Sequence, residues 1–356
     1  MNNLNQNSKD FSDAVSKWYL TSGRNNLPWR KTISPYRVWI SEIMLQQTQV
    51  KTVIPFFKKF IKKYPNLKSI SDASEDDILA LWTGLGFYRR AKNIFKTKEI
   101  IKNSYENIFP KKFDELILLP GIGRSTAGAI MSIAYKTPFP ILDANAKRVI
   151  SRFDNININS KGAIKSLWAK AEIYTPSNNI FEYTQGIMDL GATICHLRSP
   201  SCLECPLNYS CESAFKKFDI NKRNKKQKFA KKINFTLAHS NESFLLFKKN
   251  EKCFWESLWI PYDNQHDLKP DIFKQPVKSQ IQNFSHTLSH IDLDITVEII
   301  DYKKPFKIKT NLEYQWINKR KINRFGMPKP IKSIIENYVL SLIHISEPTR
   351  PERSWY

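Results

Sequence analysis

Residues 119–129 read LPGIGRSTAGA, and this stretch indicates the fold of the first half of the chain. It lies between two apolar segments with helical spacing, with Gly121 and Gly123 where a hairpin would turn and small residues where the second helix would pack closely. The pattern predicts a helix-hairpin-helix, with an ordinary helical turn as the alternative. Glycines let a backbone approach a phosphate, and the first amides of the second helix can donate hydrogen bonds to it. We therefore expect both glycines to anchor DNA without reading its sequence.

Helical spacing extends on both sides of this hairpin, from Phe11 to about Cys211. In residues 42–65, EIMLQQTQVKTVIPFFKKFIKKYP, apolar residues recur at intervals of three, four and seven. Residues 75–86, 111–121 and 162–174 show further helical stretches, bounded by Asp, Ser, Pro or Gly. We therefore expect an all-α domain over residues 12–215, preceded by a short tail over residues 1–11.

Composition indicates a globular protein that attracts polyanions. The 356 residues are 41% hydrophobic and carry a formal net charge of +23, so nucleic acid is the leading partner. A solvated basic surface without such a partner is the alternative. The start of the chain lacks a cationic segment followed by an apolar one, and no eighteen apolar residues run together. We expect a cytoplasmic protein that does not enter a membrane.

The pattern changes after residue 215. Residues 216–232 are rich in Lys and Arg and predict a linker. Beyond it the period becomes two, most clearly in residues 291–300, IDLDITVEII, which predicts a strand. An amphipathic helix over residues 330–343 closes this second, α/β domain at 233–343. Residues 344–356 have neither period nor apolar density, and we expect them to be disordered or non-native.

Four of the five cysteines lie within seventeen residues, as Cys195-x6-Cys202-x2-Cys205-x5-Cys211. Four thiolates suit either zinc or a 4Fe-4S cluster. Structural zinc usually takes two Cys-x2-Cys pairs and only one is present, so the spacing favours the cluster. The fifth, Cys253, stands apart and is expected to be a buried thiol.

Two acidic residues stand out beside these motifs. Glu42 lies next to Trp39 and Met44 in an apolar setting, although an average helical Glu faces water. Asp143 follows the hairpin by some twenty residues, at a short polar break before another helix, where a helix N-cap is the plain interpretation.

Taken in order, SEIMLQQTQV, LPGIGRSTAGAI, ILDANAKRV and the cysteine spacing resemble the MutY-type adenine DNA glycosylases of the helix-hairpin-helix superfamily, which also includes endonuclease III. The resemblance covers residues 12 to 345. It implies an α+β multidomain fold, in which an all-α glycosylase domain with a 4Fe-4S cluster loop at 195–211 precedes an α/β Nudix-like domain. Because residues 233–345 lack the run of carboxylates that holds magnesium in Nudix hydrolases, that domain is expected to bind and not to hydrolyse.

The implied function is removal of adenine from double-stranded DNA where it stands opposite 8-oxoguanine or guanine, by a monomer in the bacterial cytoplasm, near the nucleoid. Glu42 would protonate the adenine and Asp143, oriented by Asn145, would stabilise the sugar cation. Arg198, in the cluster loop, could meet a phosphate. The other implied contacts are Trp29, Arg30, Leu45 and Gln185 for the adenine pocket, Gln47 and Phe87 for wedges, and Thr48, Leu85, Ser289 and His290 for the opposite base.

Several positions depart from the family pattern. Ser125 occupies the place of the lysine nucleophile in relatives that also cut the DNA backbone, which implies a monofunctional enzyme. Phe87 replaces a tyrosine, Leu288 a phenylalanine and Ala144 a glycine. Two alternatives stay open: a bifunctional endonuclease III-like lyase acting on oxidised pyrimidines, and a non-catalytic iron-sulfur DNA-binding protein.

Overall fold

Helices make up the first two hundred residues, as their hydrophobic spacing predicts. The computed structural model describes residues 2–216, 228–250, 254–264, 273, 277–288 and 291–346. The helices of this part are α1 (Asn2–Ser22), α2 (Pro28–Lys31), α3 (Pro35–Leu45), α4 (Val50–Lys63), α5 (Leu67–Ile70), α6 (Glu75–Trp82), α7 (Arg89–Ser104), α8 (Phe113–Leu116), α9 (Arg124–Ala134), α10 (Ala144–Phe153), α11 (Ala163–Tyr174), α12 (Ile180–Thr193) and η1 (Cys202–Glu204).

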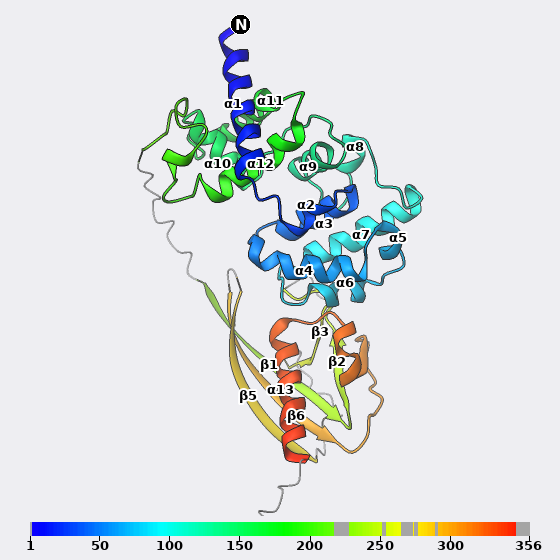
Figure 1. The fold of residues 1–356 in the computed structure, drawn as a ribbon. Helices are drawn as coiled ribbons and strands as arrows, with labels where there is room; N and C mark the ends of the chain where they lie inside the picture. Colours follow the sequence, from blue (N-terminus) through cyan, green and yellow to red (C-terminus); the bar gives the residue numbers. More distant parts are fainter. Residues whose placement is uncertain are drawn as a thin grey trace, which may run out of the picture. The chain divides into compact units, whose positions relative to one another are not determined.

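The chain divides into two compact units whose boundaries do not follow the sequence order. One contains Met1–Ala73 and Lys92–Arg223, and the other contains Ser74–Ala91 and Asn224–Tyr356. The segment with α6 therefore belongs with the C-terminal strands, although it lies inside the helical half of the sequence. Figure 1 shows the elements of each unit.

The helical unit is built around α12, which packs along α1 and against α10, while α3 packs against α9 (Figure 1). Aromatic rings fill the space near α1: Phe11 stacks on Tyr174 at a centroid distance of 4.2 Å and meets Phe153 edge-on at 4.7 Å. Because Phe11, Val15 and Tyr19 are all buried along one face of α1, residues 2–11 continue this helix. The segment 1–11, predicted as a tail, is therefore helical over its described residues.

The C-terminal unit is a seven-stranded mixed sheet with the order β3-β2-β1-β6-β5, in which β4 also pairs with β1 and β7 with β2. Strands β1 and β6 run parallel, with Phe229 opposite Ile291, and the other pairs are antiparallel. The strands are β1 (Phe229–Ser240), β2 (Ser243–Lys248), β3 (Trp259–Ile260), β4 (Tyr262–Asp263), β5 (Lys278–Thr287), β6 (Ile291–Tyr302) and β7 (Tyr314–Asn318).

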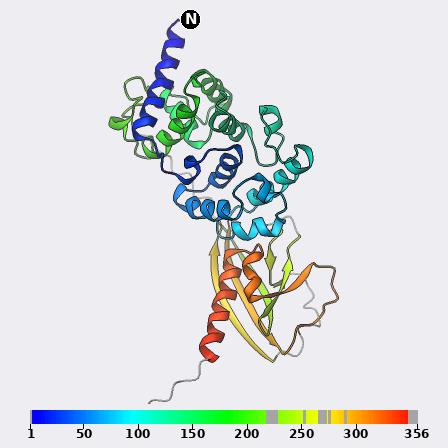
Figure 2. The same cartoon turned by 45° about the vertical axis from the view of Figure 1, so that its right-hand side comes forward.

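Alternation along β6 buries one face of the strand, as the sequence predicts: Leu293, Ile295, Val297 and Ile299 are each at most 1% exposed. A helix, α13 (Lys329–Ser346), lies along the sheet in both views (Figures 1 and 2). The Tyr338 hydroxyl donates to Asp301 at 2.7 Å and so ties α13 to β6. Residues 319–324 form a short 3-10 helix, η3 (Lys319–Arg324), before α13.

The segment with α6 is fixed within this second unit by long-range contacts. The Trp259 indole donates to Asp76 at 3.0 Å, and the Tyr88 hydroxyl donates to the Met327 carbonyl at 3.0 Å. Gly326 packs on Leu79 so closely that an added Cβ would lie 2.4 Å from the Leu79 Cβ. Leu85 and Phe87, predicted to contact DNA, therefore belong to the same unit as the sheet.

An all-α domain followed by an α/β sheet domain is confirmed. Strand β1 begins at Phe229, inside the segment 216–232 predicted as a linker, because its backbone already pairs with β6 there. The other domain boundaries stay predictions, and of the predicted C-terminal tail, residues 347–356 lie outside the described residues. Across the described part of the chain, no helix combines the length and the apolar character needed to cross a membrane.

Candidate active site and cysteine loop

The predicted hairpin is present between α8 and α9. Gly121 has a φ of +82°, and a Cβ added there would lie 2.8 Å from the side-chain amide nitrogen of Asn93. Both the backbone conformation and the close approach of Asn93 therefore favour glycine. Gly123 is the N-cap of α9, and the space around its Cα is open. Because Gly123 has no side chain, none caps the first amides of α9, which suits an anchor for phosphate. The DNA contact itself stays a prediction.

Glu42 lies on α3, a helix whose N-cap is Ser34 and whose face toward the core is apolar. Its neighbours Ser41, Ile43 and Met44 are at most 2% exposed. Burial raises the pKa of Glu42 to about 7, the nearby Asp143 acts in the same direction, and Arg30 acts to lower it. Glu42 therefore keeps its proton closer to neutral pH than an ordinary glutamate does.

Asp143 caps the N-terminus of α10. Its carboxylate accepts hydrogen bonds from the backbone amides of Ala146 at 2.8 Å and Asn145 at 3.1 Å. Burial raises the pKa of Asp143, while these amides and the Arg148 guanidinium act in the opposite direction. The amide hydrogen bonds thus favour the ionised form of Asp143 against the effect of burial, while the like charge of Asp143 favours the protonated form of Glu42.

Both carboxyl groups open into one cleft of about 910 Å³ in the helical unit, a size that accommodates a nucleoside. Ten of the residues predicted to act on substrate line this cleft. They are Trp29, Arg30, Glu42, Leu45, Gln47, Thr48, Ser125, Asp143, Asn145 and Gln185.

Ser125 joins the hairpin helix to the segment that precedes Asp143. Its hydroxyl accepts a hydrogen bond from the Leu142 amide at 3.0 Å. This contact holds the start of α9 against the residue before the α10 cap. Ser125 thus has a positional role in the cleft wall, and it places a hydroxyl, not an amine, beside the carboxyl pair.

A buried ion network forms another part of the wall. The Asp189 side chain has no exposed surface and contacts Arg30 at 2.6 Å and Arg24 at 2.6 Å. Arg30 also lies with its guanidinium over the Tyr19 ring, 5.5 Å from the centroid. Trp29, beside it, is 6% exposed and packs edge-on against Phe57.

Two arginines of α10 reach the loop that carries the cysteines. Arg148 donates to the Asn145 side chain at 2.8 Å and to the Cys195 carbonyl at 2.7 Å. Arg152 donates to the Cys195 sulfur at 3.3 Å and to the carbonyl of His196 at 2.6 Å. The helix that Asp143 caps is therefore bonded directly to the first cysteine of the quartet.

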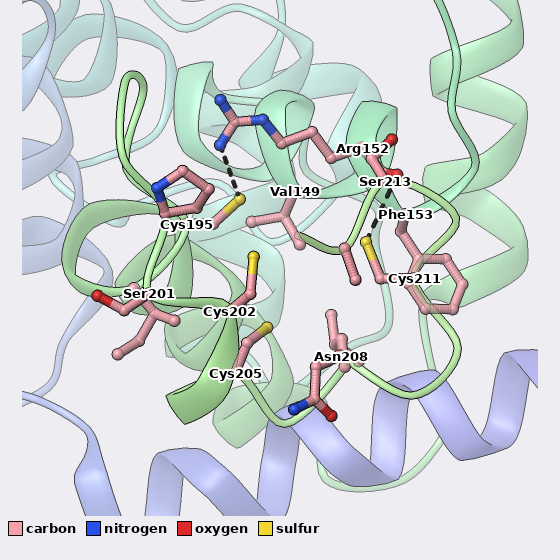
Figure 3. A pocket seen from close by; sticks show the side chains of 14 residues that line it. Val149, Arg152, Phe153, Cys195, Ser201, Cys202, Cys205, Asn208, Cys211 and Ser213 are labelled. Carbon is pink, nitrogen blue, oxygen red and sulfur yellow. Dashed lines mark hydrogen bonds between the residues drawn. The ribbon is translucent and has the colours of Figure 1, made fainter. Parts of the chain in front are cut away.

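The four predicted cysteine ligands face one apolar pocket (Figure 3). All four have free thiols. Among the described residues, no three His, Cys, Asp or Glu side chains are placed to hold a metal ion. The thiols instead surround a shared space that Val149, Phe153 and Leu207 also line. Four thiols around one shared space are a donor set that an iron-sulfur cluster can use.

Among the described residues, four predicted contacts do not line the cleft: Leu85, Phe87 and the hairpin glycines Gly121 and Gly123. Leu85 is 5% exposed and Phe87 46% exposed, and both lie in the segment that groups with the sheet. Ser289 and His290 lie outside the described residues, as does Cys253. Phe87 has a φ of +50°, and Gly84 and Gly86 before it have φ of +99° and +77°, so three residues of this short loop adopt left-handed backbone conformations.

Sequence reasoning missed the residues that support the site. Asp189, Arg24 and Arg152 lie outside every quoted motif, and Arg148 stands in ILDANAKRV without a predicted role, yet these residues hold the cleft wall and the cysteine loop. One signal was available: Gln185 and Asp189 are four residues apart, so they share a face of α12. An acidic residue on the face that carries a predicted pocket residue indicates a buried partner.

Comparison with known proteins agrees with this geometry. Residues 40–171 match the model of the HhH-GPD superfamily base excision DNA repair protein. The chain is 40% identical over 343 residues to the adenine DNA glycosylase of Buchnera aphidicola from Acyrthosiphon pisum, covering 92% of this chain and 97% of that one. It is 34% identical over 214 residues to the human adenine DNA glycosylase, covering 57% of this chain and 39% of that one.

Among solved structures, a thermostable thymine-DNA glycosylase matches with a TM-score of 0.53 and 30% identity, covering 59% of this chain and 97% of that one. An endonuclease III in a non-covalent DNA complex matches with a TM-score of 0.50 at 22% identity, covering 59% of this chain and 95% of that one, which shows the fold alone. The family resemblance in the sequence is thereby confirmed. The chain belongs to the adenine DNA glycosylases, within the HhH-GPD superfamily of base excision DNA repair proteins.

Proposed function

We propose that this chain hydrolyses the N-glycosidic bond of adenine that stands opposite 8-oxoguanine or guanine in double-stranded DNA. The observation that carries the proposal is the pairing of Glu42 and Asp143 in one cleft with unlike surroundings. Breaking this bond gives the sugar oxocarbenium character, so the reaction needs a proton donor for the base and a negative charge near the sugar. The two carboxyl groups meet these two needs separately.

In the proposed mechanism, Glu42 gives its proton to the adenine as the bond between base and sugar breaks. Asp143 acts in its ionised form, which two amides and Arg148 favour against the effect of burial, and it stabilises the sugar cation. Water then adds to the sugar carbon, and its proton returns to Glu42. Asn145, held by Arg148, lies on the first turn of α10 and would orient the groups around Asp143.

The adenine must leave the base stack to reach this cleft, and side chains must fill the gap. Gln47 supports such a role, because it is exposed at the cleft and has a φ of +58°, a conformation that projects it from the end of α3. Phe87, on the exposed loop after α6, would supply an aromatic wedge. Trp29, Arg30, Leu45 and Gln185 would line the pocket for the extruded base.

Recognition of the opposite 8-oxoguanine is assigned to Thr48 and Leu85, with Ser289 and His290 from the second, Nudix-like domain. Gly121 and Gly123 would hold the DNA backbone at the hairpin. The enzyme would act as a monomer on DNA in the bacterial cytoplasm, near the nucleoid. Ser125, in place of a lysine, supports a monofunctional reaction, since a hydroxyl forms no Schiff base.

We further propose that Cys195, Cys202, Cys205 and Cys211 hold a 4Fe-4S cluster. The supporting observation is the set of four free thiols that line one apolar pocket. When bound, the cluster would hold the loop 195–211 together. The hydrolysis requires no redox step. Arg152 would hold the loop through Cys195 and His196, and the exposed Arg198 could meet a phosphate.

The test is base release from synthetic duplexes by the purified full chain. We expect free adenine from duplexes with adenine opposite 8-oxoguanine and opposite guanine, and a strand that breaks only after alkali. Strand breakage without alkali would indicate a lyase. Release of thymine from a thymine:guanine duplex, with no adenine release, would indicate a thymine-DNA glycosylase instead. Binding without release of any base would indicate a non-catalytic protein.

A further inference from the structure

Asp189 is the most completely enclosed charge beside the cleft. It lies on α12, and its side chain has no exposed surface. Its two oxygens accept five hydrogen bonds, from the backbone amide and the Nε and Nη2 of Arg24 and from Nη1 and Nη2 of Arg30, at distances between 2.6 and 2.9 Å. One carboxylate therefore fixes two arginines that come from a distant part of the chain.

The contact with Arg30 determines both the position and the effective charge of that guanidinium. Arg30 binds Asp189 through both terminal nitrogens, a fork that sets the plane of the group. Its side chain is 4% exposed, so water screens its charge little. Burial acts to raise the pKa of Asp189, but the hydrogen bonds and charges of Arg30 and Arg24 outweigh it and lower that pKa. Asp189 is thus ionised and offsets Arg30.

The charge on Arg30 matters because it acts on Glu42. A positive charge nearby favours the ionised form of a carboxyl group, and the attraction is strong where water is excluded. Arg30 already acts to lower the pKa of Glu42, in opposition to burial and to Asp143. The charged and titratable groups that line the cleft with Glu42 are Arg24, Arg30, Lys51, Asp143, Arg148 and His196.

We propose that Asp189 is a positioning residue that holds Arg30 in the cleft wall and offsets its charge, so that Glu42 retains the proton needed for base release. The inference rests on the proposed function, in which Glu42 is the proton donor. Asp189 touches neither the base nor the sugar in this account. It acts through Arg30, and its effect is therefore specific to the pH range in which Glu42 titrates.

The experiment measures single-turnover adenine release against pH for the full-length wild type, Asp189→Asn and the matched control Asp114→Asn. Asp114 lies exposed on α8. In Asp189→Asn, the uncompensated Arg30 should move the alkaline limb of the profile about one unit to lower pH. At pH values above the alkaline limbs of both proteins, the rate of Asp189→Asn would be about tenfold below that of the wild type. The rate of the variant should recover in more acidic buffer. The control should follow the wild type.

Arg30→Gln provides an independent measurement if Asp189→Asn does not fold, as judged by circular dichroism. Removing the positive charge should move the alkaline limb to higher pH, whatever loss of rate accompanies it. The double variant Asp189→Asn/Arg30→Gln should lack the acid shift of Asp189→Asn alone. An equal loss of rate at every pH in Asp189→Asn, or an unmoved limb in Arg30→Gln, would overturn the proposal. Failure of the wild type to release adenine at any pH would instead reject the proposed function.

Discussion

A Cβ added to Gly191 would lie 2.5 Å from the Cβ of Asn145 and 2.8 Å from its Cα. The helices α10 and α12 cross here at a distance that only glycine permits. Arg148 reinforces the crossing, because it donates to both the Asn145 side chain and the Gly191 carbonyl. The position of Asp143, which caps α10, therefore depends on the absence of a side chain at Gly191.

Gly191→Ala should destabilise the protein and impair base release together. The extra methyl group has no space and must push α10 from α12, a distortion that costs about 1–3 kcal/mol. Displacement of the Asp143 cap by even a fraction of an ångström should lower the rate on the order of tenfold or more. Thermal unfolding and single-turnover release measure the two effects. An unchanged unfolding temperature would show that the helices are free to separate.

Glu42→Gln should abolish base release while leaving duplex binding close to that of the wild type. The amide has the shape of the carboxyl group but no acidic proton, and loss of a general acid lowers rates about a hundredfold to ten-thousandfold. Binding is measured by fluorescence anisotropy with the adenine:8-oxoguanine duplex, and release in a single turnover. Turnover at the wild-type rate would contradict the assignment of Glu42 as proton donor.

Asp143→Asn separates two roles of one carboxylate. Asparagine is a good helix N-cap, so the unfolding temperature should change little. The negative charge near the sugar is lost, and release should fall on the order of a hundredfold. Asp143→Ala, the companion variant, should lose stability by about 1 kcal/mol as well as activity. If Asp143→Asn retained full activity, Asp143 would be a cap alone.

The rate of adenine release should follow a bell-shaped dependence on pH. Glu42 must be protonated, and its pKa is raised to about 7, so the active form is complete below that value and is lost as pH rises through it. Asp143 must be ionised, and burial raises its pKa, so activity also falls as pH decreases, at a higher pH than for an exposed aspartate. A rate that stayed constant from pH 6 to pH 9 would contradict the role of Glu42.

Iron content should follow the cysteine quartet. Protein prepared without oxygen should hold about four iron atoms per chain and absorb visible light, as iron-sulfur proteins do. Cys202→Ser should lose iron, whereas Cys253→Ser, the fifth cysteine in the sequence, should keep it. Elemental analysis decides the point, and one zinc per chain in place of iron would reject the cluster.

Local pattern was sufficient to predict most of the framework. Alternation in β6 predicted its buried face, the glycines of residues 119–129 predicted the hairpin, and ordered motifs predicted the residues that line the cleft. Each of these signals lies within a short window of sequence, where spacing alone decides which side of an element is buried.

The supporting contacts could not be predicted in this way because their partners are far apart in the chain. Arg30 and Asp189 are 159 residues apart, and Asp76 and Trp259 are 183 apart. The hydrophobic spacing of α6 shows that one face is buried but not which element covers it. Only the folded chain shows that Trp259 and Gly326, from the unit of the sheet, contact α6.

The placement of Ser74–Ala91 in the second unit means that the polypeptide passes between the units three times: after Ala73, after Ala91 and near Arg223. A fragment that ended near Arg223 would keep α6 but lose the partners of Asp76, Leu79 and Tyr88. Its exposed apolar face would favour aggregation, and the loop that carries Phe87 would lose its anchor. The C-terminal half therefore also supports the loop of Phe87, the proposed wedge, and we expect truncation to impair base excision as well as the proposed recognition of the opposite base.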